Sequence, residues 1–341
     1  MPPEASDPAA LRPRLPSPLQ PVEDDRFTRR GLRLLLKRDD LIHPELPGNK
    51  WRKLVPNLRA AGDRPLLTFG GAYSNHLRAT AAAGRLLGRT TIGVVRGDEL
   101  ASRPLNPSLA RCAADGMRLV FTDRGTYRRK DEPEVLAALV ARAAPDGDPY
   151  VIPEGGSNAP AALGCAGLGR ETGDDLAREG ATGPAVVGVA CGTGGTLAGL
   201  AAGVPPGVRT IGFPVLRGGF LADRVLLLQR EAFGGRRGDW STEDRFHAGG
   251  YARTTPGLTG FADEFETRHG IPLERIYVAK MLQGLTTLAE EGAFAPGTTV
   301  VAVVTGHPDP LGSPHGSPRE SPGETPRKGP REDPQEASSS R

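Results

Sequence analysis

The sequence predicts an α/β protein whose parallel sheets are covered by helices on both faces. Between about residues 33 and 306, short runs rich in β-branched residues alternate with longer Ala- and Leu-rich amphipathic stretches, as in strands joined by crossover helices. The run TTVVAVVT at 298–305 is apolar on both of its alternating faces. This is the pattern of a strand that lies centrally in a parallel sheet.

The other expected strands are short apolar runs. PLLTF at 65–69 precedes the helical pattern NHLRATAAAGRLLG at 75–88, so a strand and a helix follow each other there. Four more runs indicate strands: TIGVVR at 91–96, RLVFT at 118–122, AVVGVA at 185–190 and TIGFPV at 210–215.

The composition argues against several classes of function. The 43 Lys and Arg residues nearly balance the 40 Asp and Glu residues, and the basic excess is dispersed without a sustained block, so no nucleic-acid partner is expected. The N-terminus has acids and prolines where a secretory signal needs an apolar core, and no run is long enough to span a membrane. We expect a soluble, cytoplasmic protein with no membrane partner.

The three cysteines, Cys112, Cys165 and Cys191, are widely spaced and odd in number. This suits a reducing compartment, and the spacing differs from the CxxC of zinc or thioredoxin-like sites. We interpret all three as free thiols. No spacing of histidines predicts a metal site.

The two ends of the chain differ from the rest. Residues 1–30 are expected to be a flexible segment. Residues 307–341 hold almost no core-forming residue, and proline recurs every fourth position from Pro310 through Pro334, so this tail should be disordered or locally polyproline II. A solvated tail without function is favoured over a proline-rich docking ligand.

A first chemical signal lies in KRDDLIHPELPGNKWRKL at 37–54, where Lys50 stands at the start of a helical segment. A lysine that forms an imine must lose its proton near neutral pH, which enclosure beside other cations promotes. The alternative is an ordinary solvated lysine, and the local pattern alone favours that alternative.

A second signal is LLTFGGAYSNHLRATAAAG at 66–84, where a strand ends in two glycines and Ser74, Asn75 and His76 open a helix. The unpaired N–H groups of a helix start and the Ser74 hydroxyl can hold a carboxylate. Alternatively, Ser74 or Asn75 simply caps the helix.

A third signal is VVGVACGTGGTLAGL at 186–200, a strand that runs into a glycine-rich loop and then a helix. Successive N–H groups and two threonine hydroxyls can form a cup for one phosphate. The loop lacks the lysine of an ATP-binding loop and the spacing and acid of a dinucleotide loop, so a nucleotide-binding α/β protein is a minor alternative.

Together with PEGGSN at 153–158 and IYVAKMLQGL at 276–285, these motifs resemble the 1-aminocyclopropane-1-carboxylate deaminase and D-cysteine desulfhydrase family. Its members are fold type II pyridoxal-phosphate enzymes, similar to the tryptophan synthase β subunit. The resemblance covers roughly residues 35–306. It implies a two-lobed fold, with a large cofactor-binding domain (31–53 and 151–306) and a small domain (54–150), and a homodimer.

The resemblance also implies roles for single residues. Lys50 would carry pyridoxal 5'-phosphate as a Schiff base and move the substrate's α-proton, and Asn75 would contact the hydroxyl of the pyridoxal ring. The substrate carboxylate would lie on Ser74, Asn75 and His76. The phosphate would lie in the cup formed by Gly192, Thr193, Gly194, Gly195 and Thr196.

Two tyrosines match active-site positions of the family. Tyr277 stands in ERIYVAK. Tyr251 stands in HAGGYARTTPG, which matches loosely, so an ordinary packed tyrosine is an equal alternative there.

The branches of this family differ at three inspectable places. Deaminases that open the cyclopropane ring resemble one another in a Tyr-Glu pair beside the pyridine nitrogen, whereas this chain has Tyr277-Val278. Desulfhydrase-like members have a threonine before the glycines of the last core strand, and Thr305-Gly306 fits that place. Their carboxylate loop also tends to have Ser-Asn-His, as here. The resemblance therefore favours a desulfhydrase-like enzyme over a cyclopropane deaminase.

A hydroxyl beside the ring nitrogen makes the cofactor a weaker electron sink than a carboxylate does, and β-elimination can proceed with the weaker sink because its leaving group accepts the electrons. We expect pyruvate and ammonia from a small amino acid, with Tyr277 or Tyr251 assisting the leaving group. After Gly306 the composition changes abruptly where relatives continue with Gly-Gly. The other alternative is therefore an inactive relative that binds the cofactor.

Overall fold

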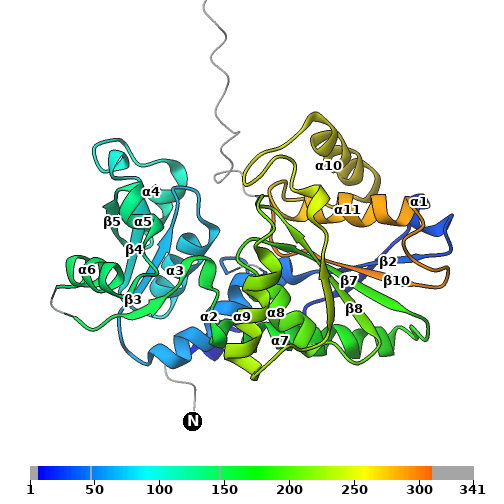
Figure 1. Ribbon diagram of the computed structural model, residues 1–341, viewed down its shortest axis with the longest axis horizontal. Coiled ribbons are helices and arrows are strands. Elements are labelled where there is room, and N and C mark those ends of the chain that lie inside the picture. The colour runs from blue at the N-terminus through cyan, green and yellow to red at the C-terminus, as the bar shows by residue number, and fades with distance from the viewer. Residues whose placement is uncertain (1–6, 47, 146, 309–341) are drawn as a thin grey trace, which may run out of the picture.

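The computed structural model describes residues 7–46, 48–145 and 147–308. Its strands form two sheets, and each sheet is packed against its own helices. The helix α2 (Asn49–Ala61) lies between the two sheets and their helices (Figure 1). Among the described residues, no helix combines the length and the apolar character that crossing a membrane requires.

The larger sheet has six strands, and five of them are parallel. Its order is β1-β2-β10-β7-β8-β9, and only the edge strand β1 runs antiparallel, paired to β2. The central strand β10 lies between β2 and β7. The strands are β1 (Leu19–Val22), β2 (Arg33–Lys37), β7 (Ala185–Cys191), β8 (Val208–Pro214), β9 (Asp239–Thr242) and β10 (Thr299–Val303).

Both faces of this sheet are apolar and covered by helices, so its central strands are buried on each side. Successive residues of β10 alternate: Val300 packs in one core cluster and Val301 in the other. One face is covered by α7, α8 and α9, and the other by α1, α10 and α11 (Figure 1). These helices are α1 (Asp25–Thr28), α7 (Ala159–Arg178), α8 (Gly195–Gly203), α9 (Leu221–Phe233), α10 (Pro256–His269) and α11 (Val278–Glu290).

The smaller sheet is wholly parallel, with the order β5-β4-β3-β6. Two further apolar clusters hold its helices against it. The elements are β3 (Leu66–Gly70), β4 (Thr91–Arg96), β5 (Arg118–Thr122), β6 (Tyr150–Ile152), α3 (Asn75–Leu86), α4 (Pro107–Ala114), α5 (Arg124–Arg128) and α6 (Pro133–Ala143). Short 3₁₀ turns complete the structure at Pro8–Leu11, Asp39–Leu41, Asp98–Leu100, Glu154–Gly156 and Asp244–Phe246.

The helix α7 is in close contact with α2 and α8. A Cβ atom on Gly199 would lie 2.2 Å from the carbonyl oxygen of Ala162, and one on Gly164 would lie 2.1 Å from that of Arg52. Glycine is required at such contacts because any larger side chain would push the helices apart. Three helices are thereby packed backbone to backbone.

The predicted α/β class is confirmed, and every strand expected from the sequence is present. The three cysteines are free thiols, as expected, and all three are buried. The expectation of a flexible segment over 1–30 was wrong for residues 7–30, because β1 pairs with β2 and Phe27 is buried in the core. Within the expected tail, residues 309–341 lie outside the described residues.

Replacing Gly48 by alanine should destabilise the protein strongly. Gly48 has φ +64° and ψ −143°, and a Cβ there would lie 1.7 Å from the carbonyl oxygen of Thr305. We expect a loss of about 3 kcal/mol or more in the free energy of unfolding, measured with urea. The control is Gly88→Ala, which has a similar φ of +65° but no neighbour within 4 Å and should lose only about 1 kcal/mol. Equal losses would contradict the close contact.

Candidate functional site

A cavity of about 840 Å³ opens where several parallel strands of both sheets end. Its wall includes the segments that follow β3, β7 and β10, together with the starts of α2 and α3. The carboxyl ends of parallel strands are the usual place for ligands in α/β folds. The volume is in the range that holds a cofactor and a small substrate together.

The structure brings the residues selected from the sequence to this one cavity. All of them except Gly195 line its wall, and Gly195 is buried as the first residue of α8 behind it. The lining members are Lys50, Ser74, Asn75, His76, Gly192, Thr193, Gly194, Thr196, Tyr251, Tyr277 and Thr305.

Lys50 lies in the first turn of α2 and is connected to the glycine-rich loop. Its Nζ donates to Asn49 Oδ1 at 2.9 Å, and Asn49 Nδ2 donates to Thr196 Oγ1 at 2.9 Å. Burial, and then the nearby Lys53 ammonium, lower the pKa of Lys50 to about 7. A large fraction of this amine is therefore unprotonated at neutral pH.

Lys53 is a site residue that the sequence reasoning missed. Its Nζ donates to the Gly155 carbonyl at 3.1 Å and to Ser157 Oγ at 3.0 Å. Its side chain is buried, and none of the described carboxylates forms an ion pair with it. Burial lowers the pKa of Lys53 as well. The signal was present, because residues three apart share a helix face, so Lys53 points the same way as Lys50.

The segment Gly192–Thr196 forms a turn at the start of α8. Gly194 has φ +82°, and no side chain caps the helix start, so backbone N–H groups there can bind an anion. A Cβ on Gly195 would lie 3.3 Å from Lys53 Nζ. Ser157 Oγ and Thr193 Oγ1 are 2.5 Å apart and add hydroxyl groups to the same place.

The start of α3 is a second place where backbone donors face the cavity. Ser74 caps this helix, because its Oγ accepts from the Leu77 N–H at 3.2 Å. The side-chain oxygen of Asn75 accepts from Arg78. From the sequence alone, Ser74 could cap the helix or bind a ligand; its Oγ caps α3, and the residue also lines the cavity.

His76 has a buried side chain with a single hydrogen-bond partner. Thr68 Oγ1 donates to the Ile152 carbonyl at 2.8 Å, so it accepts from His76 Nε2 at 2.8 Å. Burial, with the Lys50 and Lys53 charges, keeps the pKa of His76 well below its usual range. The imidazole is therefore neutral, and its Nδ1 has no hydrogen-bond partner.

Tyr277 and Tyr251 face each other across the cavity wall. Their ring centroids are 6.1 Å apart in an edge-on arrangement. Burial, followed by the neighbouring Tyr251 and Glu274, keeps the pKa of Tyr277 well above its usual value. Tyr277 is thus held as a protonated donor, while Tyr251 remains 39% exposed.

Two buried charged residues that the sequence reasoning missed hold these tyrosines. Glu274 accepts from the N–H groups at the start of α11, including that of Tyr277 at 2.7 Å. Lys280 Nζ donates to the His247 and Gly250 carbonyls, each at 2.9 Å, and so anchors the loop before Tyr251. An acid just before a helix start was the available signal for Glu274.

Thr305 and Val278, two of the positions at which the family branches differ, lie in different surroundings. Thr305 lines the cavity beside Gly48. Val278 follows Tyr277 in the chain, but its side chain is fully buried in the core of the larger sheet. Among the described residues there is no group of three His, Cys, Asp or Glu residues that could hold a metal ion.

Comparison with known proteins gives concordant results. The family model described as "Pyridoxal-phosphate dependent enzyme" matches residues 12–306. A D-cysteine desulfhydrase of Klebsiella pneumoniae (strain 342) is 32% identical, with 81% of this chain and 87% of that protein covered. A Pyrococcus horikoshii protein, described provisionally as a 1-aminocyclopropane-1-carboxylate deaminase, is 29% identical, with 81% and 85% covered.

A solved structure of an ACC deaminase homologue is also similar to this chain. It superposes with a TM-score of 0.70 at 28% identity, over 90% of this chain and 95% of that chain. Threonine deaminase isoform 2 of Solanum lycopersicum, at 19% identity and a TM-score of 0.59, has a similar fold.

Lys50 should react as an amine near neutral pH. Its pKa of about 7 lies below the ordinary lysine value of 10.5, so the unprotonated fraction should be half-maximal near pH 7 and complete well below pH 10. The measurement is the rate of Lys50 acylation by a limiting neutral reagent across pH, located by peptide mass spectrometry. Lys280, whose pKa is lowered by burial only to about 8, is the comparator and should reach its half-maximal rate at a higher pH than Lys50. A half-maximal rate near 10.5 for Lys50 would contradict its enclosure.

Proposed function

Because this chain belongs to the family of pyridoxal-phosphate dependent enzymes, we propose that it catalyses β-elimination and deamination of a small amino acid, as a D-cysteine desulfhydrase does. D-Cysteine and one water would give pyruvate, ammonia and hydrogen sulfide. The observation that carries the proposal is the pair of lysines on one face of α2. Lys50 has an amine with a pKa of about 7, and Lys53 is buried with no carboxylate partner among the residues that the structure describes.

The residues present fit the phosphate of the cofactor. A buried ammonium without a carboxylate is costly unless an anion accompanies it. Lys53 Nζ lies beside Gly195, where the N–H groups of α8 also point. A phosphate in the Gly192–Thr196 cup would accept from both and would balance the charge.

When bound, pyridoxal phosphate would supply an electron-withdrawing ring that is linked to the substrate's α-carbon through the substrate's amino nitrogen. Lys50 is suited to hold it covalently and to take the α-proton, because its amine is unprotonated near neutral pH. Asn49 fixes the direction of that amine by accepting from it at 2.9 Å. Thr305 is the candidate partner of the ring nitrogen.

The substrate carboxylate would bind at the start of α3. The Ser74 hydroxyl and the helix N–H groups there lie in the cavity wall, and a helix start favours anions. For His76 we propose a contribution through its backbone N–H, because its side chain is turned to Thr68. Tyr277 is the candidate donor to the departing thiolate, since its raised pKa keeps its proton in place.

The surroundings of Tyr277 favour elimination over ring opening. Val278 occupies the position after Tyr277 and is packed in the core, so it brings no carboxylate to a ring nitrogen. A threonine hydroxyl at Thr305 leaves the ring a weaker electron sink. Elimination can use the weaker sink because the leaving group accepts the electrons.

The first test is turnover by the full-length chain loaded with pyridoxal phosphate. We expect pyruvate from D-cysteine, with a smaller rate for L-cysteine and no 2-oxobutanoate from 1-aminocyclopropane-1-carboxylate. Lys50→Ala should lower the D-cysteine rate by roughly 100- to 10,000-fold, because the group that moves the proton is gone.

The other outcomes identify the alternatives. Release of 2-oxobutanoate would favour the deaminase, and bound cofactor without product from any of these substrates would indicate a relative without this activity. Turnover of D-cysteine by Lys50→Ala at the parent rate would exclude Lys50 from the chemistry.

Lys53→Met should weaken binding of the cofactor phosphate. We expect the dissociation constant for pyridoxal phosphate to rise roughly 10- to 100-fold, as for loss of one charge-assisted hydrogen bond. The constant for pyridoxal, which has no phosphate, should change little. Lys280→Met is the matched control, because Lys280 is also buried and binds two carbonyls away from the cup. Equal weakening for pyridoxal and pyridoxal phosphate would rule out a phosphate contact.

A further inference from the structure

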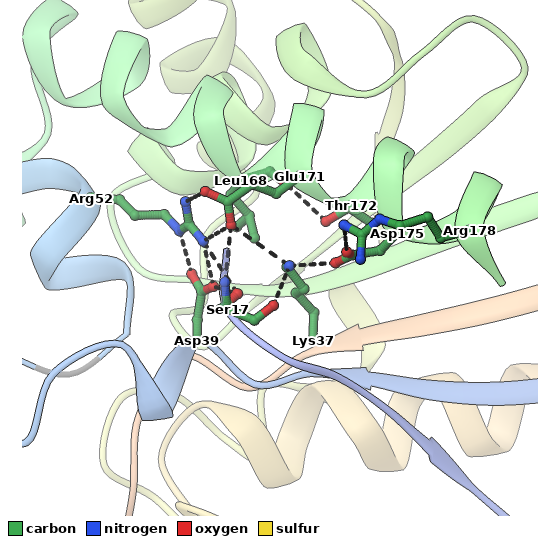
Figure 2. A network of polar contacts seen from close by, with 9 residues as sticks. All are labelled: Ser17, Lys37, Asp39, Arg52, Leu168, Glu171, Thr172, Asp175 and Arg178. Atoms are coloured by element: carbon green, nitrogen blue, oxygen red, sulfur yellow. Dashed lines mark hydrogen bonds and ion pairs between the residues drawn. The ribbon is translucent and has the colours of Figure 1, made fainter. Parts of the chain in front are cut away.

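The helix that carries Lys50 is held from its opposite side by a buried network of charged residues. Figure 2 shows Arg52 of α2 pointing into this network, with Glu171 and Asp175 of α7 and with Lys37 of β2. Because a helix turns about 100° per residue, side chains two residues apart point roughly 200° apart. Arg52 therefore faces away from the cavity that Lys50 lines.

Arg52 binds two carboxylates at once. Its Nε and Nη2 donate to Asp39 at 2.7 and 2.8 Å, and its Nη1 and Nη2 donate to Glu171 at 3.0 and 2.8 Å. Ser17 joins the two acids, because its Oγ donates to Asp39 at 2.6 Å and its N–H donates to Glu171 at 3.2 Å. Such forked contacts fix orientation as well as distance.

Asp39 also holds the chain on the other side of Lys50. Its backbone carbonyl accepts from the Gly48 N–H at 2.9 Å, while its carboxylate binds Arg52. Asp39, two residues after the end of β2, thus binds Gly48 and Arg52, which lie two residues before and two residues after Lys50. The first turn of α2 cannot rotate or slide without breaking one of these contacts.

The 3₁₀ turn that contains Asp39 is hydrogen bonded to the residue that follows the last strand, β10. The Asp40 N–H donates to the Val304 carbonyl at 2.9 Å, and the Val304 N–H donates to the Lys37 carbonyl at 2.9 Å. Thr305 follows directly. The contacts that place Lys50 are therefore continuous with those that place Thr305 at the cavity wall.

Stability alone does not account for this network. Its buried and partly buried members are two cations and three anions, Lys37, Arg52, Asp39, Glu171 and Asp175, and the exposed Arg178 pairs with Asp175 at the edge. The desolvation of buried ion pairs offsets most of their attraction, and apolar replacements are often equally stable. The paired hydrogen bonds from Arg52 to Asp39 and Glu171 are better explained by the fixed position that they give to α2.

We infer that Arg52 is a positioning residue, whose grip on Asp39 and Glu171 sets where α2 presents Lys50 to the cavity. The inference rests on the proposed function in taking Lys50 as the reacting amine. The groups that act on the charge of Lys50 are Lys53, Cys165 and Glu274, with His76 also nearby. None belongs to the network, so Arg52 acts on Lys50 by holding the helix.

The test compares Arg52→Met with Arg26→Met in the full-length chain. Arg26 is a matched control, because it also binds two carboxylates, Asp24 at 2.9 Å and Glu264 at 2.9 Å, and its polar and aromatic partners among the described residues lie outside α2. Three quantities are measured: the urea unfolding midpoint, the pH midpoint of Lys50 acylation without cofactor, and kcat and KM with the substrate that turns over. The acylation needs no cofactor or substrate, so it decides the inference even if the proposed reaction fails.

We expect Arg52→Met to raise the acylation midpoint of Lys50 by about one pH unit or more, because the amine is less enclosed when α2 shifts. Its kcat should fall roughly 10- to 100-fold with KM changed less than about 3-fold, as for a small misplacement of a reacting group. Arg26→Met should change neither quantity. Arg52→Lys, which keeps the charge but loses the fork, should shift both in the same direction.

The inference is overturned if a folded Arg52 variant keeps the parent acylation midpoint and kcat. It is equally overturned if Arg26→Met shifts the acylation midpoint and kcat as much as Arg52→Met does, since the effect would then come from a general loss of rigidity in the protein. If Arg52→Met fails to fold, Glu171→Gln is used in its place. This variant keeps the hydrogen bonds from Arg52 to Asp39 and weakens those from Arg52 to α7. An unchanged acylation midpoint in that variant contradicts the inference.

Discussion

The arrangement of the site depends on how closely α2 and α8 approach α7. Gly164 of α7 faces the Arg52 carbonyl and Gly199 of α8 faces the Ala162 carbonyl, and a Cβ at either glycine would lie little more than 2 Å from the oxygen. This spacing allows no side chain between the helices. It brings the first turn of α2 to the start of α8, so that Asn49 reaches Thr196.

The helix α2 separates two electrostatic environments. On one side Arg52 is fully paired with carboxylates in a buried network (Figure 2). On the other side, Lys50 and Lys53 face the cavity and hydrogen bond to neutral groups. Neutral partners in a desolvated setting lower a lysine's pKa, whereas carboxylates would raise it. The same short helix therefore carries one cation that is paired with carboxylates and, on its other side, two lysines that face the cavity.

The sequence predicted the elements that have a periodic pattern and missed those that do not. The central strands are continuous apolar runs, whereas β1 contains Pro21 and takes its place only by pairing with β2. The glycine-rich turn at Gly192–Thr196 has a local signature, whereas Lys50 was selected through the resemblance of several motifs to a known family, because its local pattern alone favours a solvated lysine. The Arg52 contact to Glu171 joins residues 119 positions apart, and no local pattern could indicate it.

We propose that pyridoxal phosphate is bound through Lys50, with Lys53 reserved for the phosphate. The most direct measurement is borohydride reduction of the cofactor-loaded chain, followed by peptide mass spectrometry to locate the modified lysine. We expect one pyridoxyl phosphate group per chain, on Lys50. Modification of Lys53 instead, or of scattered surface lysines without a preferred site, would contradict it.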